Sequence, residues 1–94
     1  MMGSAPILMK IITPEHIVYS QKINHAIIPT IDAKEGIYIN HIPFLTMLTE
    51  GDIKLYLNNN EILKANIKSG MAQFRDNILT ILTHNEPAIC EIAS

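Results

Sequence analysis

The chain has 94 residues, of which 48% are hydrophobic and 17% are charged, and its formal net charge is −2. A chain of this length forms one domain and buries roughly two thirds of its unfolded surface, so the large hydrophobic share indicates either a large core or an apolar surface that meets a partner. Its seven Lys and Arg residues supply neither the cationic surface that nucleic acid requires nor a basic cluster for anionic lipid.

The domain is expected to extend from residue 7 to residue 94. Residues 1–6 (MMGSAP) are expected to form a tail, either native or left over from cloning, with Met9 as an alternative native start. No apolar run approaches the roughly 18 residues of a transmembrane helix, and the start lacks the basic and apolar regions of a secretion signal.

The hydrophobic pattern repeats at every second residue, so the chain is expected to consist of β-strands. The first two strands are predicted at residues 7–13 and 22–28, because each β-rich run ends at a proline. The later predicted elements are strand 53–57, turn 58–60, strand 61–67, turn 69–70, strand 71–75, turn 76–77, strand 78–83, turn 85–87 and strand 88–92. Only residues 45–50 have a pattern that allows a turn of helix. Short strands with a turn about every eight to twelve residues predict an all-β fold, an antiparallel sandwich or barrel.

The sequence contains no motif for catalysis or for binding a metal ion or a nucleotide. Cys90 is the only cysteine, which excludes an intrachain disulfide, and its strand context predicts a small, inert side chain. Gly36, Gly51 and Gly70 are too far apart for a phosphate-binding loop and are instead expected at backbone positions with positive φ. The sequence has no H-x-x-x-H or H-x-H spacing of a metal site, so His16, His25 and His84 are not expected to bind a metal ion.

The most informative stretch is residues 35–53, which read EGIYINHIPFLTMLTEGDI. This stretch resembles the signature G-E-x-G-[IV]-x-x-x-H-[AV]-P-x-[LIV]-T-x-[LI]-x-x-G-x-[IV] of the epsilon subunits of F-type ATP synthases. Five shorter landmarks of the same family occur in the same order around it: residues 11–15, 18–20, 28–29, 68–70 and 77–82. Each landmark is weak alone, but their joint order and spacing are specific.

The resemblance implies a flattened antiparallel β-sandwich of about ten short strands. It also implies a non-catalytic subunit of the central stalk, the rotor of the proton-driven ATP synthase. Such a subunit docks on the gamma subunit and on the ring of c subunits. It thereby couples proton transport to ATP synthesis at the cytoplasmic face of the bacterial inner membrane, without inserting into the membrane. The alternative is a free-standing β-sandwich module that binds another protein.

Members of that family usually continue into a helical hairpin, which inhibits ATP hydrolysis and in some members binds ATP. This chain stops at Ser94, either because it is a truncated piece of a longer protein or because the natural subunit is short. We therefore expect no inhibition by a hairpin, no ATP site and no cofactor.

The resemblance assigns a group of residues to the interface with gamma: Thr13, His41, Ile42 and Pro43. For His41 the alternative is a turn histidine whose ring is satisfied by local hydrogen bonds. For Thr13 the alternative is a hydroxyl that caps the turn at Pro14. Within the same apolar stretch, Leu45 and Leu48 are expected to face the core.

The resemblance assigns the charged loop with Asp32, Lys34 and Glu35 to the contact with the ring. The alternative is an ordinary solvated turn. The family has an acidic residue at the position of Lys34, with a carboxylate one residue later here, at Glu35. Because neighbouring strand residues point to opposite faces, Glu35 is not an automatic substitute. The resemblance therefore predicts where the ring contact lies but leaves its chemistry open.

Overall fold

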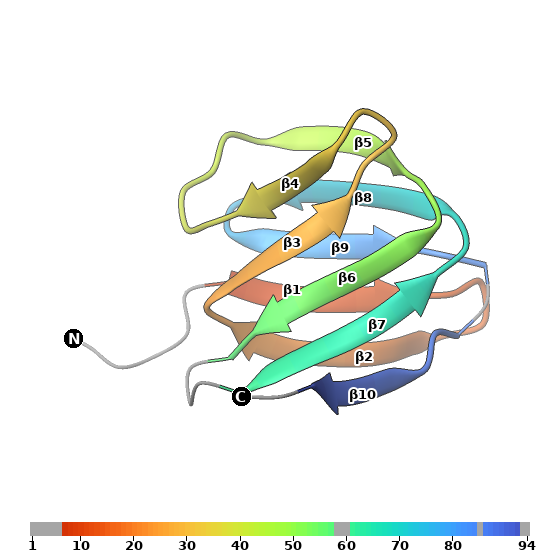
Figure 1. Cartoon of the computed structure of the whole chain (residues 1–94). Helices are drawn as coiled ribbons and strands as arrows, with labels where there is room; N and C mark the ends of the chain where they lie inside the picture. Colours follow the sequence, from red (N-terminus) through yellow and green to blue (C-terminus); the bar gives the residue numbers. More distant parts are fainter. Residues whose placement is uncertain (1–6, 58–60, 85, 93–94) are drawn as a thin grey trace.

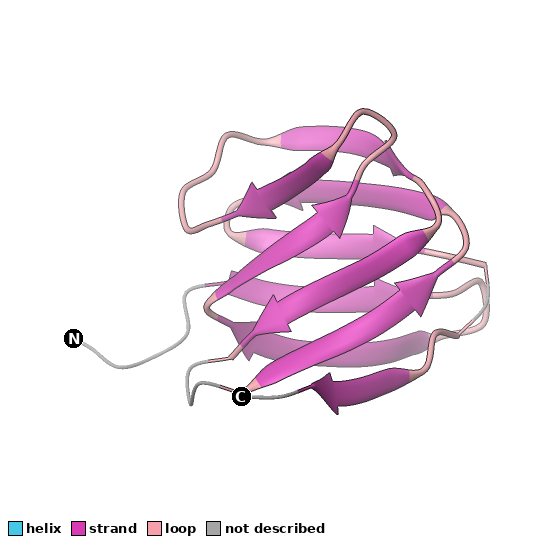
Figure 2. Ribbon diagram, in the orientation of Figure 1, coloured by secondary structure: helices cyan, strands magenta, loops and turns pink. Residues whose placement is uncertain are grey.

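The computed structural model describes residues 7–57, 61–84 and 86–92, and these residues form two five-stranded β-sheets that face each other (Figures 1 and 2). Sheet 1 contains, in spatial order, β2 (Ile17–Ile23), β1 (Ile7–Ile12), β9 (Ile78–Leu82), β8 (Gly70–Arg75) and β5 (Phe44–Leu48). Sheet 2 contains β10 (Ile89–Ile92), β7 (Ile62–Ile67), β6 (Gly51–Tyr56), β3 (His25–Pro29) and β4 (Lys34–Ile37). Neighbouring strands are antiparallel except β1 and β9, which are parallel. The predicted all-β sandwich is confirmed.

The core lies between the two sheets and is built from alternate strand residues. Ile7, Met9 and Ile11 of β1 are fully buried, while the residues between them are half-buried on the outer face. Phe74 is the largest fully buried side chain. β-Branched isoleucine suits these inward positions because it packs well on a pleated surface. Within the described ranges, no helix is long and apolar enough to cross a membrane.

The predicted strand at residues 22–28 is wrong, because this run is divided between the two sheets. β2 ends at Ile23 in sheet 1, and β3 begins at His25 in sheet 2. Asn24 lies between them, and its backbone N–H donates a hydrogen bond to the carbonyl oxygen of Tyr56 at 2.7 Å. Both halves of the run are rich in apolar residues, so the hydrophobic pattern conceals the crossing.

The turn of helix allowed at residues 45–50 is also wrong, because residues 44–48 form the edge strand β5. This strand gains a full ladder of pairs with β8. The two-residue period points Phe44 and Leu48 inward and Leu45 outward. Leu48 is buried as predicted, but Leu45, which we expected in the core, is 63% exposed.

The tight turn predicted at Asp76-Asn77 is confirmed. Both residues have positive φ, 53° and 60°, which is the pattern of a two-residue type I′ turn. This turn joins β8 to β9 with a twist that matches that of the strands. The turn predicted at residues 58–60 lies outside the described residues, as do Asn85 and the tail at residues 1–6.

The expectation of positive φ at Gly36, Gly51 and Gly70 is wrong, since none of them lies in the left-handed region. At these positions the absence of a side chain leaves room for atoms of neighbouring residues. A Cβ on Gly51 would lie 3.1 Å from the Cβ of Pro29, and a Cβ on Gly70 would collide with the carbonyl oxygen of Leu82. The left-handed positions are occupied by polar residues: Asn40, Asp76 and Asn77.

Gly70→Ala is expected to lower the free energy of unfolding by about 1–3 kcal/mol, because the new methyl group would meet a backbone oxygen that cannot rotate away. Gly36→Ala is the matched control. Its methyl group would lie 3.0 Å from the ring of Tyr38, an exposed side chain that can turn aside. Urea denaturation of both variants measures the difference. Equal losses would contradict the argument from Leu82.

Candidate docking surfaces

The outer face of sheet 1 carries an unbroken row of apolar side chains, one from each strand: Ile17, Ile12, Leu82, Met71 and Met47, here called the apolar row. The strand register sets these residues directly opposite one another. Ile17 is 55% exposed and Met47 is 53% exposed. Leu45 stands beside Met47 on β5, so the row widens at this edge of the sheet.

The rest of this outer face is different. Lys10, Thr80 and Gln73 form the next row, which ends at Leu45. In the row beyond it, Lys22 and Arg75 flank two half-buried apolar residues, Leu8 and Ile78. Polar side chains are the usual occupants of an outward, solvated sheet face. A contiguous exposed apolar strip at one end of such a face indicates a surface that another protein covers.

Thr13 lies at the rim of a shallow hollow of about 470 Å³ beside the apolar row. Its side chain is buried, and its hydroxyl donates a hydrogen bond to the carbonyl oxygen of His16 at 3.3 Å. Its backbone N–H donates to the same oxygen at 3.0 Å. Thr13 therefore closes the turn after β1, as its alternative reading anticipated. A role for it at the gamma interface stays a prediction.

The loop that carries His41 is held by a pair of asparagines. The backbone N–H of Asn40 donates to Oδ1 of Asn77 at 2.7 Å, and Nδ2 of Asn77 donates to Oδ1 of Asn40 at 3.2 Å. Asparagine tolerates the left-handed backbone that both residues adopt. The β8–β9 turn thereby fixes the loop, and Ile42, which is 74% exposed, projects from it next to exposed Pro43.

His41 joins the two predicted interfaces. Its Nε2 lies 3.5 Å from Oε2 of Glu35, a residue that we assigned to the ring contact. Its Nδ1 donates to the carbonyl oxygen of Ile42 at 2.8 Å. The ring also stands edge-on to Phe44 and Phe74, with centroids 5.4 and 6.0 Å away. Both polar partners are acceptors, so the ring satisfies both only when both of its nitrogens carry a proton.

The loop assigned to the ring contact is built around Thr30, which we did not predict as a site residue. Its backbone N–H donates to the carbonyl oxygen of Ala33 at 2.9 Å, and its Oγ1 accepts from the backbone N–H of Ala33 at 3.1 Å. The backbone N–H of Ile31 donates to the carbonyl oxygen of Met47 at 3.1 Å. A threonine directly after a proline-ended strand is a turn signal that could have identified this residue.

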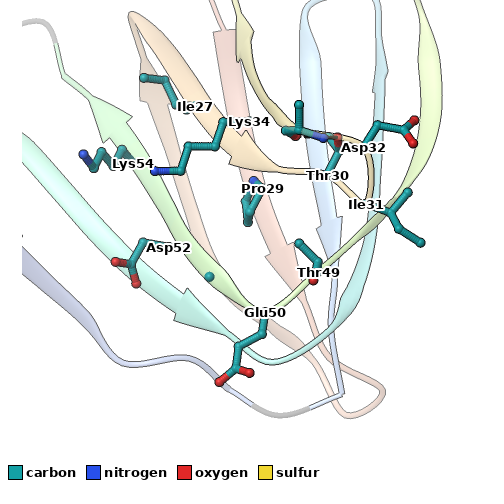
Figure 3. A pocket seen from close by; sticks show the side chains of 12 residues that line it. Ile27, Pro29, Thr30, Ile31, Asp32, Lys34, Thr49, Glu50, Asp52 and Lys54 are labelled. Atoms are coloured by element: carbon teal, nitrogen blue, oxygen red, sulfur yellow. Dashed lines mark hydrogen bonds between the residues drawn. The ribbon is translucent and has the colours of Figure 1, made fainter.

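Lys34 and Glu35 point to opposite sides of β4, as the strand period requires. Lys34 lines a groove of about 660 Å³ on the outer face of sheet 2, whereas Glu35 contacts His41. The groove also contains Asp32, and Lys54 lies on its far side (Figure 3). The three predicted ring residues therefore do not form one cluster, because the carboxylate of Glu35 is directed away from the groove.

A stack of aromatic rings crosses the other end of sheet 2. The ring of His25 lies between Tyr38 and Tyr56, with centroids 4.8 and 4.2 Å away. Partial burial lowers the pKa of His25 below its ordinary value. The described residues contain no group of three or more His, Cys, Asp or Glu side chains that could hold a metal ion.

Stability is expected to fall in mild acid through His25. Because its pKa is lowered on folding, the unfolded chain takes up the proton first as the pH drops through about 6.5, and the folded state loses stability from there down to the folded pKa. His25→Phe retains the stacking and removes the proton, so its melting temperature should vary less over this range. Thermal melts from pH 7.5 to 5 measure this pH dependence. His25→Gln is the control, because it removes both the aromatic stacking and the titrating proton. An unchanged pH profile in both variants would exclude His25 as the cause.

The described residues therefore form a β-sandwich with an exposed apolar row on one sheet and a charged groove on the other. The family model of the ATP synthase delta/epsilon chain β-sandwich domain matches residues 7–86. The chain belongs to this family, which confirms the resemblance stated from the sequence.

Curated ATP synthase epsilon chains are similar along most of this chain. The protein of Maridesulfovibrio salexigens is 32% identical over 95% of this chain and 62% of its own length. The chloroplastic protein of Cyanidium caldarium is 31% identical over 79% and 55% of the two chains. The protein of Rickettsia typhi is 32% identical over 82% and 72%. The chain thus spans about three fifths of the length of the first two relatives.

Solved structures share the fold. A chain of the Euglena gracilis mitochondrial ATP synthase, solved with OSCP, F1 and the c-ring, superposes with a TM-score of 0.80 at 17% identity, covering 88% of this chain and 54% of that one. A chain from the central stalk and c-ring of the Tetrahymena thermophila enzyme gives 0.69 at 14% identity, covering 89% and 67%. At such identities the likeness establishes the fold alone.

Proposed function

We propose that the chain is a non-catalytic central-stalk subunit of a proton-driven ATP synthase, bound peripherally at the cytoplasmic face of the bacterial inner membrane. It docks on the gamma subunit and on the ring of c subunits, and it transmits rotation between them. Membership of the delta/epsilon family supports this role, as do the ATP synthase complexes that contain its structural neighbours.

The apolar row is the observation that carries the proposal. Each large apolar side chain removed from water contributes roughly 1.5–3 kcal/mol, so the exposed members of one row are enough to anchor a small domain. Ile42 and Pro43 are exposed on the loop that enters β5 at the other end of sheet 1, and exposed Leu45 lies between this loop and Met47 along β5. We assign the row and this loop to gamma, together with the predicted contact at His41.

We assign the contact with the ring of c subunits to the loop at residues 30–34. This loop is hydrogen-bonded to the strand that carries Met47 of the apolar row, through the backbone N–H of Ile31. The backbone N–H of Thr49 likewise donates to the carbonyl oxygen of Pro29 at 2.9 Å. A load on the loop therefore passes directly to the surface assigned to gamma, as a rotor part requires.

The test is co-elution of this chain with the purified gamma subunit from the same source on a sizing column. A stable one-to-one complex supports the proposal. If folded gamma does not bind, either alone or together with the c-ring, the chain is instead a free-standing interaction module with another partner.

A further inference from the structure

The groove on sheet 2 contains two lysine side chains, Lys34 and Lys54, that form no ion pair with any described residue. We propose that this groove receives an acidic loop of the ring subunit and that the two ammonium groups bind its carboxylate. The inference rests on the proposed function and specifies the chemistry of its ring contact.

Two of the three carboxylates along the groove have partners, and the third, Asp32, points away from both lysines (Figure 3). Oδ1 of Asp52 accepts a hydrogen bond from Nδ2 of Asn66 at 2.9 Å, and Oδ2 of Asp52 lies 3.9 Å from Nζ of Lys64. Oε2 of Glu50 lies 3.8 Å from Nζ of Lys68. Because these contacts partly neutralise Asp52 and Glu50, the two carboxylates attract Lys34, Lys54 or an incoming cation less strongly.

The two lysines stand on either side of β3 above an apolar floor. Lys34 pairs with Pro29 across β3 and β4, and Lys54 pairs with Ile27 across β3 and β6. Ile27 and Pro29 both line the groove. In Figure 3 the side chain of Lys34 extends across the groove towards Lys54, while Asp32 points away from both. The arrangement fits a segment that presents a carboxylate next to a small apolar side chain.

Electrostatics favours such an occupant. Two like charges facing one groove repel each other, and an anion placed between them removes that repulsion and adds two attractions. Glu35 does not provide this anion, because it lies on the opposite side of β4 beside His41. A partner loop with a cation at the same place would meet Lys34 and Lys54 directly and would be repelled.

Carbodiimide cross-linking of the assembled synthase tests the contact. The reagent activates a carboxyl group, and a touching lysine amine attacks it to form an amide with release of the urea, so only groups in direct contact are joined. We expect a cross-link from Lys34 or Lys54 to a carboxyl group of the c subunit, identified by mass spectrometry. Lys34→Glu should weaken retention on detergent-solubilised c-ring from the same source by about tenfold.

Lys22→Glu is the matched control, since Lys22 is exposed on β2 of the other sheet and has no ion pair with a described residue. It should be retained like the wild type. The inference is overturned if the chain assembles, neither groove lysine is cross-linked to the ring, and Lys34→Glu is retained like Lys22→Glu. In that case the central-stalk role stands. If the chain is missing from the complex altogether, the central-stalk role fails as well.

Discussion

Replacing Leu45 and Met47 together by glutamate is expected to weaken binding of the chain to the gamma subunit by about 100-fold. The two side chains are 63% and 53% exposed, so glutamate finds water in the free chain. In the complex both carboxylates would be buried against an apolar partner. Losing two apolar contacts of roughly 1.5 kcal/mol each already accounts for about 100-fold in Kd. Titration calorimetry with purified gamma measures the change.

The fold should tolerate the same pair of substitutions. Exposed substitutions away from special features usually change stability by less than about 0.5 kcal/mol each. Ser20→Glu is the control for added charge, because Ser20 faces outward on the other edge strand of sheet 1, outside the apolar row. The apolar row is not the gamma surface if the double variant loses as much free energy of unfolding as it loses free energy of binding. The same follows if Ser20→Glu weakens binding as much as the double variant does.

The fold class could be predicted because the two-residue period survives in nearly every strand. Ile53, Leu55 and Leu57 alternate with half-buried neighbours as the sequence indicated, and all three are buried. The period fails to specify which sheet a strand joins, so the crossing at Asn24 was missed. It also fails to specify which alternate set faces the core, and this explains the wrong side for Leu45.

The apolar row could not be found from the sequence, because it exists only across strands. Its five members are scattered from Ile12 to Leu82, and each looks like an ordinary strand residue on its own chain segment. Register alone aligns them. The Asn40–Asn77 pair is hidden for the same reason, since 37 positions separate the two residues. By contrast, the turn signal at Thr30 and the charged loop that contains Lys34 can be recognised in the sequence itself.

Phe74→Ala is expected to lower the free energy of unfolding by about 3–5 kcal/mol, a large part of the roughly 5–15 kcal/mol that stabilises a domain. Phe74 is 1% exposed and stacks on Phe44, with ring centroids 6.0 Å apart and planes 16° apart. It also supports the edge of His41. Removing it leaves a cavity between β8 and the loop of His41 that the surrounding strands cannot close.

Phe44→Ala is the matched control, because Phe44 is only half-buried on the edge strand β5 and water can fill the space it leaves. Urea denaturation should therefore show a clearly smaller loss for Phe44→Ala than for Phe74→Ala. Equal losses would mean that Phe74 is not the main support at this end of the core. Phe74→Leu should recover most of the stability, since it restores apolar volume, but not the edge-on contact with His41. If Phe74→Leu folds normally yet binds gamma more weakly, the ring of Phe74 acts on docking by positioning His41 rather than only by filling the core.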